Sequence, residues 1–128
     1  MSSRRVFEPR ADDVGAARHF AKAVVESWGV SSDDIEIVVG ELAANAQRHA
    51  GSCFGVSLDQ MSGAVLIEVT DASPQLPRLL STPPSRTAGR GLVMVDRLAR
   101  SWGVRNDLEG GKIVWAEIAM SADRLDEV

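Results

Sequence analysis

The stretch SSDDIEIVVGELAANAQRHAG, residues 31–51, is the part of this chain from which its fold can best be inferred. Its apolar residues recur three and four positions apart, the spacing that places side chains on one face of a helix. This apolar stripe consists of Ile35, Val38, Val39, Leu42 and Ala46. Ser31 with Asp34 resembles a capping box, and Gly51 is a stop signal after about Ala50. We therefore predict an amphipathic helix with one face on the core.

Two polar side chains, Glu41 and Asn45, stand one helical turn apart beside this stripe. We expect both to be half-buried, so that they can face a cleft while the helix stays packed. The amide oxygen of Asn45 can ligate Mg²⁺, and the carboxylate of Glu41 can orient a water or accept a proton from an attacking hydroxyl. The alternative is a solvated pair at a helix edge, which is the better interpretation when the two residues are considered alone.

The segments on either side of this helix predict a small sheet. On the N-terminal side, residues 4–8 suggest a short edge strand, and Asp12 and Asp13 offer an N-cap for a helix that ends at Gly29. On the C-terminal side, apolar residues alternate with polar ones before and after the turn at residues 61–63. That pattern is typical of a β-hairpin.

A long irregular segment follows, because residues 72–88 hold four of the five prolines. Gly89-Arg90-Gly91 then leads into a short amphipathic helix, and two strands are expected at residues 101–105 and 112–120. We predict an α/β two-layer sandwich: a mixed, mostly antiparallel sheet with the helices on one face. The whole chain, 1–128, forms one domain with a polar tail at about 121–128.

Composition narrows the classes of function. The formal net charge is -4 and the pI is about 5.1, which argues against nucleic acid as a direct partner. Only one cysteine is present, so no disulfide can form within the chain. No run approaches the ~18 apolar residues that a membrane span needs, and the first residues lack a signal core. We expect a cytoplasmic protein without membrane contact.

Two further features suggest a nucleotide. Asp71 falls where a buried strand ends, and a carboxylate there can accept a hydrogen bond from an exocyclic amine such as that of adenine. Gly89 and Gly91 precede a helix whose free N–H groups can bind phosphate. Each feature has a simpler interpretation: an Asx-turn at Asp71, and ordinary punctuation between loop and helix at the glycines. In this order, with Glu41 and Asn45, they point to Mg-ATP.

These motifs resemble those of the GHKL ATPases, which share the Bergerat ATP-binding fold, and within them the small anti-sigma-factor serine/threonine kinases of actinobacterial type. Glu41 to Ala46, with His49 and Ala50, is similar to the N box of that family. Asp71 matches the G1 box aspartate, and Gly89-Arg90-Gly91-Leu92 matches the G2 box. The resemblance covers almost the whole chain.

The resemblance implies a role for each residue. Glu41 is the general base or a water-orienting carboxylate, Asn45 holds Mg²⁺ against the phosphates, and Asp71 binds the adenine amino group. Further contacts with ATP are implied for Ser73, Gly89, Arg90, Gly91 and Leu92. The implied substrate is a serine or threonine of an anti-sigma-factor antagonist, and the implied partners are that antagonist and a sigma factor. The resemblance also allows a homodimer.

Departures from the family pattern leave alternatives open. After Asp71 the chain has Ala72, Ser73 and Pro74 where the G1 box usually has glycines, and Lys112-Ile113 stands where many relatives carry a threonine. The alternative is therefore a nucleotide-binding interaction module of the same fold with little or no kinase activity. An ATPase domain of histidine-kinase type is disfavoured, because His19 lies within the first predicted helix and not on a helix ahead of it.

Overall fold

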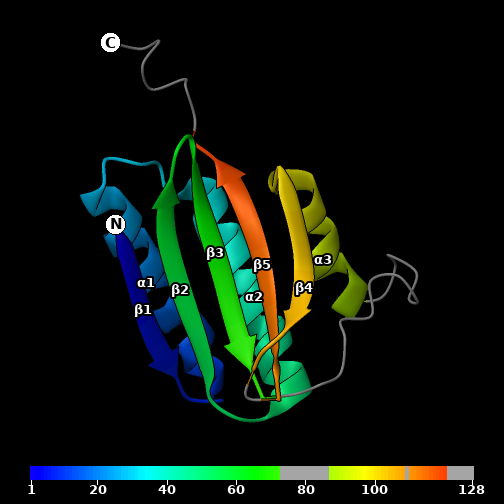
Figure 1. Ribbon diagram of the computed structural model, residues 1–128. Coiled ribbons are helices and arrows are strands. Elements are labelled where there is room, and N and C mark those ends of the chain that lie inside the picture. The colour runs from blue at the N-terminus through cyan, green and yellow to red at the C-terminus, as the bar shows by residue number, and fades with distance from the viewer. Residues whose placement is uncertain (73–86, 109, 121–128) are drawn as a thin grey trace.

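The computed structural model describes residues 1–72, 87–108 and 110–120. Within these residues, five strands form one sheet and three helices cover one of its faces (Figure 1). The elements in chain order are β1 (Ser2–Phe7), α1 (Ala11–Ser27), α2 (Asp33–Ala50), β2 (Phe54–Met61), β3 (Ala64–Asp71), α3 (Thr87–Leu98), β4 (Ser101–Asn106) and β5 (Lys112–Ala119). The predicted two-layer α/β sandwich and its order of elements are confirmed.

The sheet has the strand order β1-β2-β3-β5-β4, and each of these neighbouring pairs is antiparallel. We expected a mixed sheet, and the described strands show a purely antiparallel one. The reason is the pairing of the helices. The helix α1 carries the chain to the far end of the sheet and α2 brings it back, so β2 runs opposite to β1 (Figure 1).

The core lies between the sheet and the helix layer. Helix α2 is central: it packs on β2, β3 and β5, and its flanks contact α1 and α3. The stripe predicted from its sequence is buried, with every member at most 2% exposed. None of the helices in the described ranges is long and apolar enough to cross a membrane. The sequence pattern therefore identified the central helix and its buried face correctly.

The helix ends follow the glycines. Gly29 has a positive φ of 76°, and its N–H bonds the carbonyl of Glu26 while that of Val30 bonds Val25. These two bonds form a Schellman motif, which uses a left-handed residue just beyond the helix. Gly51 ends α2 in the left-handed conformation, with φ of 61°. Both predicted stops are confirmed.

The predicted start of α1 is wrong in detail. Its N-cap residue is Arg10, and Asp12 and Asp13 lie within the first turn, where they favour the helix dipole but do not cap it. The carboxylate of Asp13 instead accepts a 2.7 Å hydrogen bond from the backbone N–H of Glu8. It therefore ties the end of β1 to the helix.

The capping box predicted for α2 is also absent from the described structure. The helix begins after Ser32, whose hydroxyl donates a 2.6 Å hydrogen bond to the carboxylate of Glu36. This bond joins two side chains one turn apart and leaves no role for the predicted Ser31–Asp34 pair. The first turn of α2 is thus held by a side-chain bond to Glu36.

Candidate functional site

The candidate site begins on α2, where Glu41 and Asn45 occupy successive turns. Glu41 is half-buried, as expected, but Asn45 is only 3% exposed and belongs to the buried polar residues. The side chain of Asn45 forms no hydrogen bond with the described residues, and its polar atoms are not among the fully buried ones that lack a partner. The amide therefore keeps contact with solvent and is accessible to a ligand.

Asp71 is the last residue of β3 and lies on the face of the sheet that the helices cover. The strand alternates, so Asp71 is in phase with the buried Val65, Ile67 and Val69. Its side chain is 1% exposed and forms an ion pair with Lys112, in which Nζ lies 3.0 Å from Oδ1. The structure therefore places a buried carboxylate where the sequence predicted a base-binding one.

Lys112 is the functional candidate for which the sequence analysis assigned no role. It opens β5 and pairs in register with Asp71, and its side chain is also 1% exposed. A signal was available, because Lys112 is in phase with Val114, Ala116 and Ile118, which are all buried. A lysine in the buried phase of a strand needs an anionic partner, since lysine is almost never fully buried unless paired.

The glycine motif lies differently from the prediction. We expected Gly89, Arg90 and Gly91 to precede the helix, but α3 begins at Thr87 and includes all three in its first turns. The first turn of a helix can include glycines, because the backbone N–H groups there have no intrahelical partner in any sequence. Leu92 packs in the hydrophobic core at 1% exposure. Its predicted contact with ATP, and those of the three preceding residues, stay predictions.

Ser73 and most of the loop at 72–88 lie outside the described residues, as do the side chains of His49 and Ala50 and the tail at 121–128. Of the irregular G1 turn only Ala72 is described, and it is exposed.

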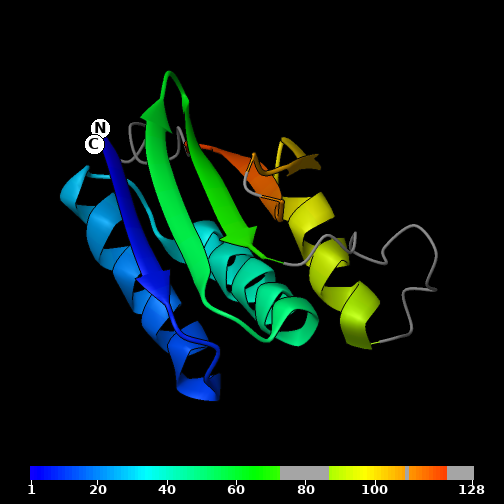
Figure 2. The ribbon, with the colours of Figure 1, turned by 60° about the horizontal axis from the view of Figure 1, so that its bottom comes forward.

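The site's elements meet at one end of the molecule. The C-terminal ends of α2 and β3 and the N-terminal ends of α3 and β5 lie toward the lower end in Figure 1, and Figure 2 shows the same grouping from a second side. This end therefore combines the buried ion pair with the N-terminus of α3, while Asn45 and Glu41 lie five and nine residues before the last residue of α2. The described residues contain no group of three or more His, Cys, Asp or Glu side chains that could hold a metal by themselves.

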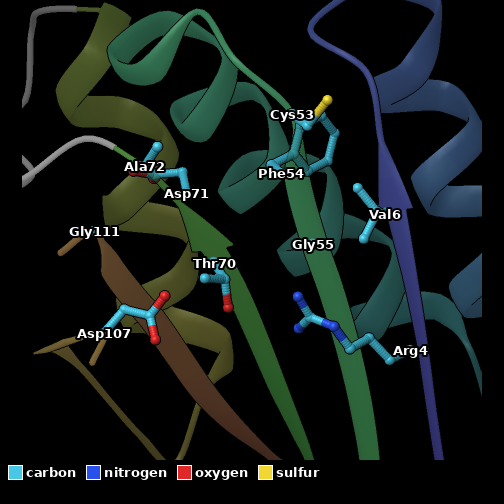
Figure 3. Close-up of a pocket in the computed structure, with 10 residues that line it drawn as sticks. All are labelled: Arg4, Val6, Cys53, Phe54, Gly55, Thr70, Asp71, Ala72, Asp107 and Gly111. Carbon is cyan, nitrogen blue, oxygen red and sulfur yellow. The ribbon is translucent and has the colours of Figure 1, made fainter. Parts of the chain in front are cut away.

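A hollow of about 220 Å³ opens on the opposite, helix-free face of the sheet (Figure 3). Arg4 borders it and lies across Gly55, where any side chain would meet the guanidinium. Thr70 and Asp107 approach from the other side. Asp71 also lines this hollow, whereas Glu41 and Asn45 do not. The hollow and the helix-covered site therefore share Asp71 at the end of β3.

Comparison with known proteins gives an independent view of this arrangement. The sequence profile of the histidine kinase-like ATPase domain family matches residues 7–118. No curated protein matches the chain. Two solved structures are similar to it. The histidine kinase domain of the EL346 blue-light activated histidine kinase from Erythrobacter litoralis has a TM-score of 0.52 and 25% identity, over 73% of this chain and 46% of that one.

The second similar structure is the Acinetobacter baumannii histidine kinase AdeS, with a TM-score of 0.56 and 15% identity, over 93% of this chain and 68% of that one. At this identity the likeness concerns the fold alone. The chain spans less than half of the first solved structure, which contains more than the region matched here.

Proposed function

The chain belongs to the histidine kinase-like ATPase domain family of the GHKL superfamily, and we propose that it is an anti-sigma-factor serine/threonine kinase. In this proposal it binds Mg-ATP and phosphorylates an antagonist protein. It also binds a sigma factor, and the phosphorylation state of the antagonist regulates that interaction. The family supports an ATP-binding module, and the phosphoryl transfer, its acceptor and the partners are the proposed part.

The observation that carries the proposal is the buried amide of Asn45 beside Glu41. A helix that served packing alone would have an apolar residue at a position only 3% exposed. The amide has no hydrogen bond to the described residues, and a carboxylate stands one turn before it. This donor set fits a hard cation shared with phosphate oxygens, because Mg²⁺ in such sites uses one or two protein oxygens plus the substrate phosphates.

In the proposed site, the amide oxygen of Asn45 would hold Mg²⁺, and the chemistry supplied by the bound ion would be neutralisation of charge on the phosphates. Asp71 binds the amino group of adenine, and the N-terminal turns of α3 bind phosphate. The serine or threonine hydroxyl of the antagonist attacks the γ-phosphorus while its proton passes to Glu41. The bond from that phosphorus to the bridging oxygen breaks, and ADP leaves. Catalysis then consists mainly of positioning and charge stabilisation.

A transfer assay tests this proposal. The protein is incubated with γ-labelled ATP, Mg²⁺ and candidate antagonist proteins. Glu41→Gln should keep ATP binding but lower the transfer rate by about 10²-fold or more, because it removes the general base. Asn45→Ala should abolish Mg-dependent binding. Glu26→Gln, the same change on an exposed face of α1, is the matched control and should leave both unchanged. Transfer at the wild-type rate by Glu41→Gln would contradict the role given to that residue.

The nature of the phosphoacceptor is a separate question, because both similar solved structures are histidine kinases. A second candidate function is therefore transfer to a histidine of a partner protein. Phosphoserine and phosphothreonine survive acid, whereas phosphohistidine is hydrolysed by acid and survives alkali. Label that is stable in acid supports our proposal, and label lost in acid supports the histidine acceptor.

The third candidate is a nucleotide-binding module without transfer. One feature favours it: the G1 sequence Ala72-Ser73-Pro74, which lacks the expected glycines. Calorimetric titration with Mg-ATP that shows binding, together with no transfer to any candidate antagonist, would support this module. Absence of any nucleotide binding would contradict all three functions.

A further inference from the structure

The buried ion pair between Asp71 and Lys112 is the feature that the proposed function leaves unexplained. The two residues stand opposite each other in the β3–β5 register, and both side chains are 1% exposed. The ammonium donates to one particular oxygen, Oδ1, at 3.0 Å. A charge at this depth loses several kcal/mol of hydration unless an opposite charge compensates it. Each charge of the pair therefore stabilises the other at this depth.

The backbone around Lys112 is built for this contact. Gly110 has a φ of 100°, which favours glycine. A side chain at Gly111 would overlap the carbonyl oxygen of Asp71 and come within 3.0 Å of Cα of Ala72. Because Gly111 has no side chain, the start of β5 can approach the end of β3 closely. Any other residue at position 111 would hold these two segments further apart.

This approach fixes the orientation of the carboxylate. An aspartate at the end of a strand, without a cation, gains hydration by turning outward to water. The hydrogen bond from Nζ to Oδ1 opposes that rotation, and a charged donor makes it stronger than a neutral one would. The carboxylate of Asp71 is therefore held inward, toward the helix layer that carries Asn45. In this orientation it can accept a hydrogen bond from the amino group of a base.

We propose that Lys112 is the positioning residue of the base-recognition site: its ammonium holds the Asp71 carboxylate in the orientation that reads the 6-amino group of adenine. Lys112 acts through Asp71 and does not itself need to touch the nucleotide. The inference rests on the proposed ATP binding and adds to it the residue that sets base selectivity.

The test compares two nucleotides, ATP and purine riboside triphosphate, which lacks the 6-amino group. The ratio of their Kd values is the amine preference. For the wild type we expect a preference of about tenfold or more for ATP, the size of one hydrogen bond to a charged group. Lys112→Gln keeps a neutral donor near Asp71 and removes the charge, and Lys112→Arg keeps the charge. Lys22→Gln is the matched control, since Lys22 is the other lysine of the chain and lies exposed on α1.

If Lys112 positions Asp71, Lys112→Gln should bring the amine preference close to one. Its affinity for the purine riboside analogue should stay within about twofold of the wild type, and Lys112→Arg should restore part of the preference. A purely structural pair would lower both affinities equally and leave the ratio unchanged. That result, or a larger ratio, would overturn the inference while ATP binding stood. If Lys112→Gln does not fold, Lys112→Arg provides the ratio: its differently placed donors should lower the amine preference below the wild-type value while the affinity for the purine riboside analogue stays within about twofold. An equal loss of both affinities in Lys112→Arg overturns the inference. Wild-type protein that binds neither nucleotide would overturn the proposed function itself.

Discussion

Both faces of the sheet carry an ion pair, and the two pairs lie in opposite surroundings. On the helix-covered face, Asp71 and Lys112 are each 1% exposed. On the open face, Arg105 and Glu68 form a pair whose side chains are 51% and 16% exposed. An ion pair under the helices therefore contributes differently to stability from an ion pair in water. In the buried pair each charge requires its partner, whereas water and salt compensate the exposed charges.

Lys112→Met should have the largest effect on stability, because it leaves a buried carboxylate without its cation. We expect the free energy of unfolding to fall by about 3–5 kcal/mol, measured by urea denaturation. The double variant Asp71→Asn/Lys112→Met removes both charges and should recover most of that loss. A single variant with a loss below about 1 kcal/mol would mean that the two buried charges do not depend on each other.

Gly111→Ala tests the close approach that brings this pair together. The added Cβ would overlap backbone atoms of Asp71, and backbone cannot rotate away as a side chain can. We expect a loss of about 1–3 kcal/mol in unfolding free energy, typical of overpacking, and weaker ATP binding because the pair is displaced.

Gly55→Ala is the matched control for Gly111→Ala on the open face. There the added Cβ would meet only the guanidinium end of Arg4, which is exposed and free to turn into solvent. Gly55 is buried, but its neighbour is the far end of a flexible side chain, so we expect a change within about 0.5 kcal/mol. Equal losses at the two glycines would show that the two faces do not differ in rigidity.

Asn45→Ala tests whether the buried amide on the covered face lowers the stability of the apo protein while it serves nucleotide binding. The substitution removes a buried amide that has no described partner and improves helix propensity by about 0.5 kcal/mol. We expect the apo protein to become more stable by about 0.5–1 kcal/mol in thermal or urea unfolding, and Mg-ATP to stabilise the variant no further. A loss of stability instead would show that the amide serves the fold.

The sequence predicted those features that depend on local periodicity. The stripe from Ile35 to Ala46 and the stops at Gly29 and Gly51 depend on spacing of a few residues, and each is found in the structure. The predictions that were wrong depend on geometry beyond that range. The carboxylate of Asp13 does not cap the helix, because it accepts a hydrogen bond from the backbone N–H of Glu8. That contact depends on the path of the chain between β1 and α1.

The site was predicted in the same uneven way. The positions of Glu41, Asn45 and Asp71 follow from a helix face and a strand end, which are local. The partner of Asp71 lies 41 residues away and depends on the β3–β5 register, which no local pattern fixes. Only the phase of Lys112 relative to Val114 and Ala116 indicated its burial. The part of the site that could not be predicted from the sequence is therefore the part that depends on the register between distant strands.

The exposed pair on the open face should give the smallest effect and completes the comparison. A double-mutant cycle of Glu68→Gln and Arg105→Gln should measure a coupling of about 0.2–1 kcal/mol in unfolding free energy. That coupling should shrink in about 1 M NaCl, where the Debye length falls to about 3 Å. The same cycle on Asp71 and Lys112 should give a larger coupling that salt barely changes, because ions do not reach a pair that is 1% exposed. A coupling above about 2 kcal/mol for Glu68 and Arg105 would mean that another molecule or segment shields the open face from water in solution. The contrast between the two faces would then reflect what covers each of them, and exposure in the single chain would no longer explain it.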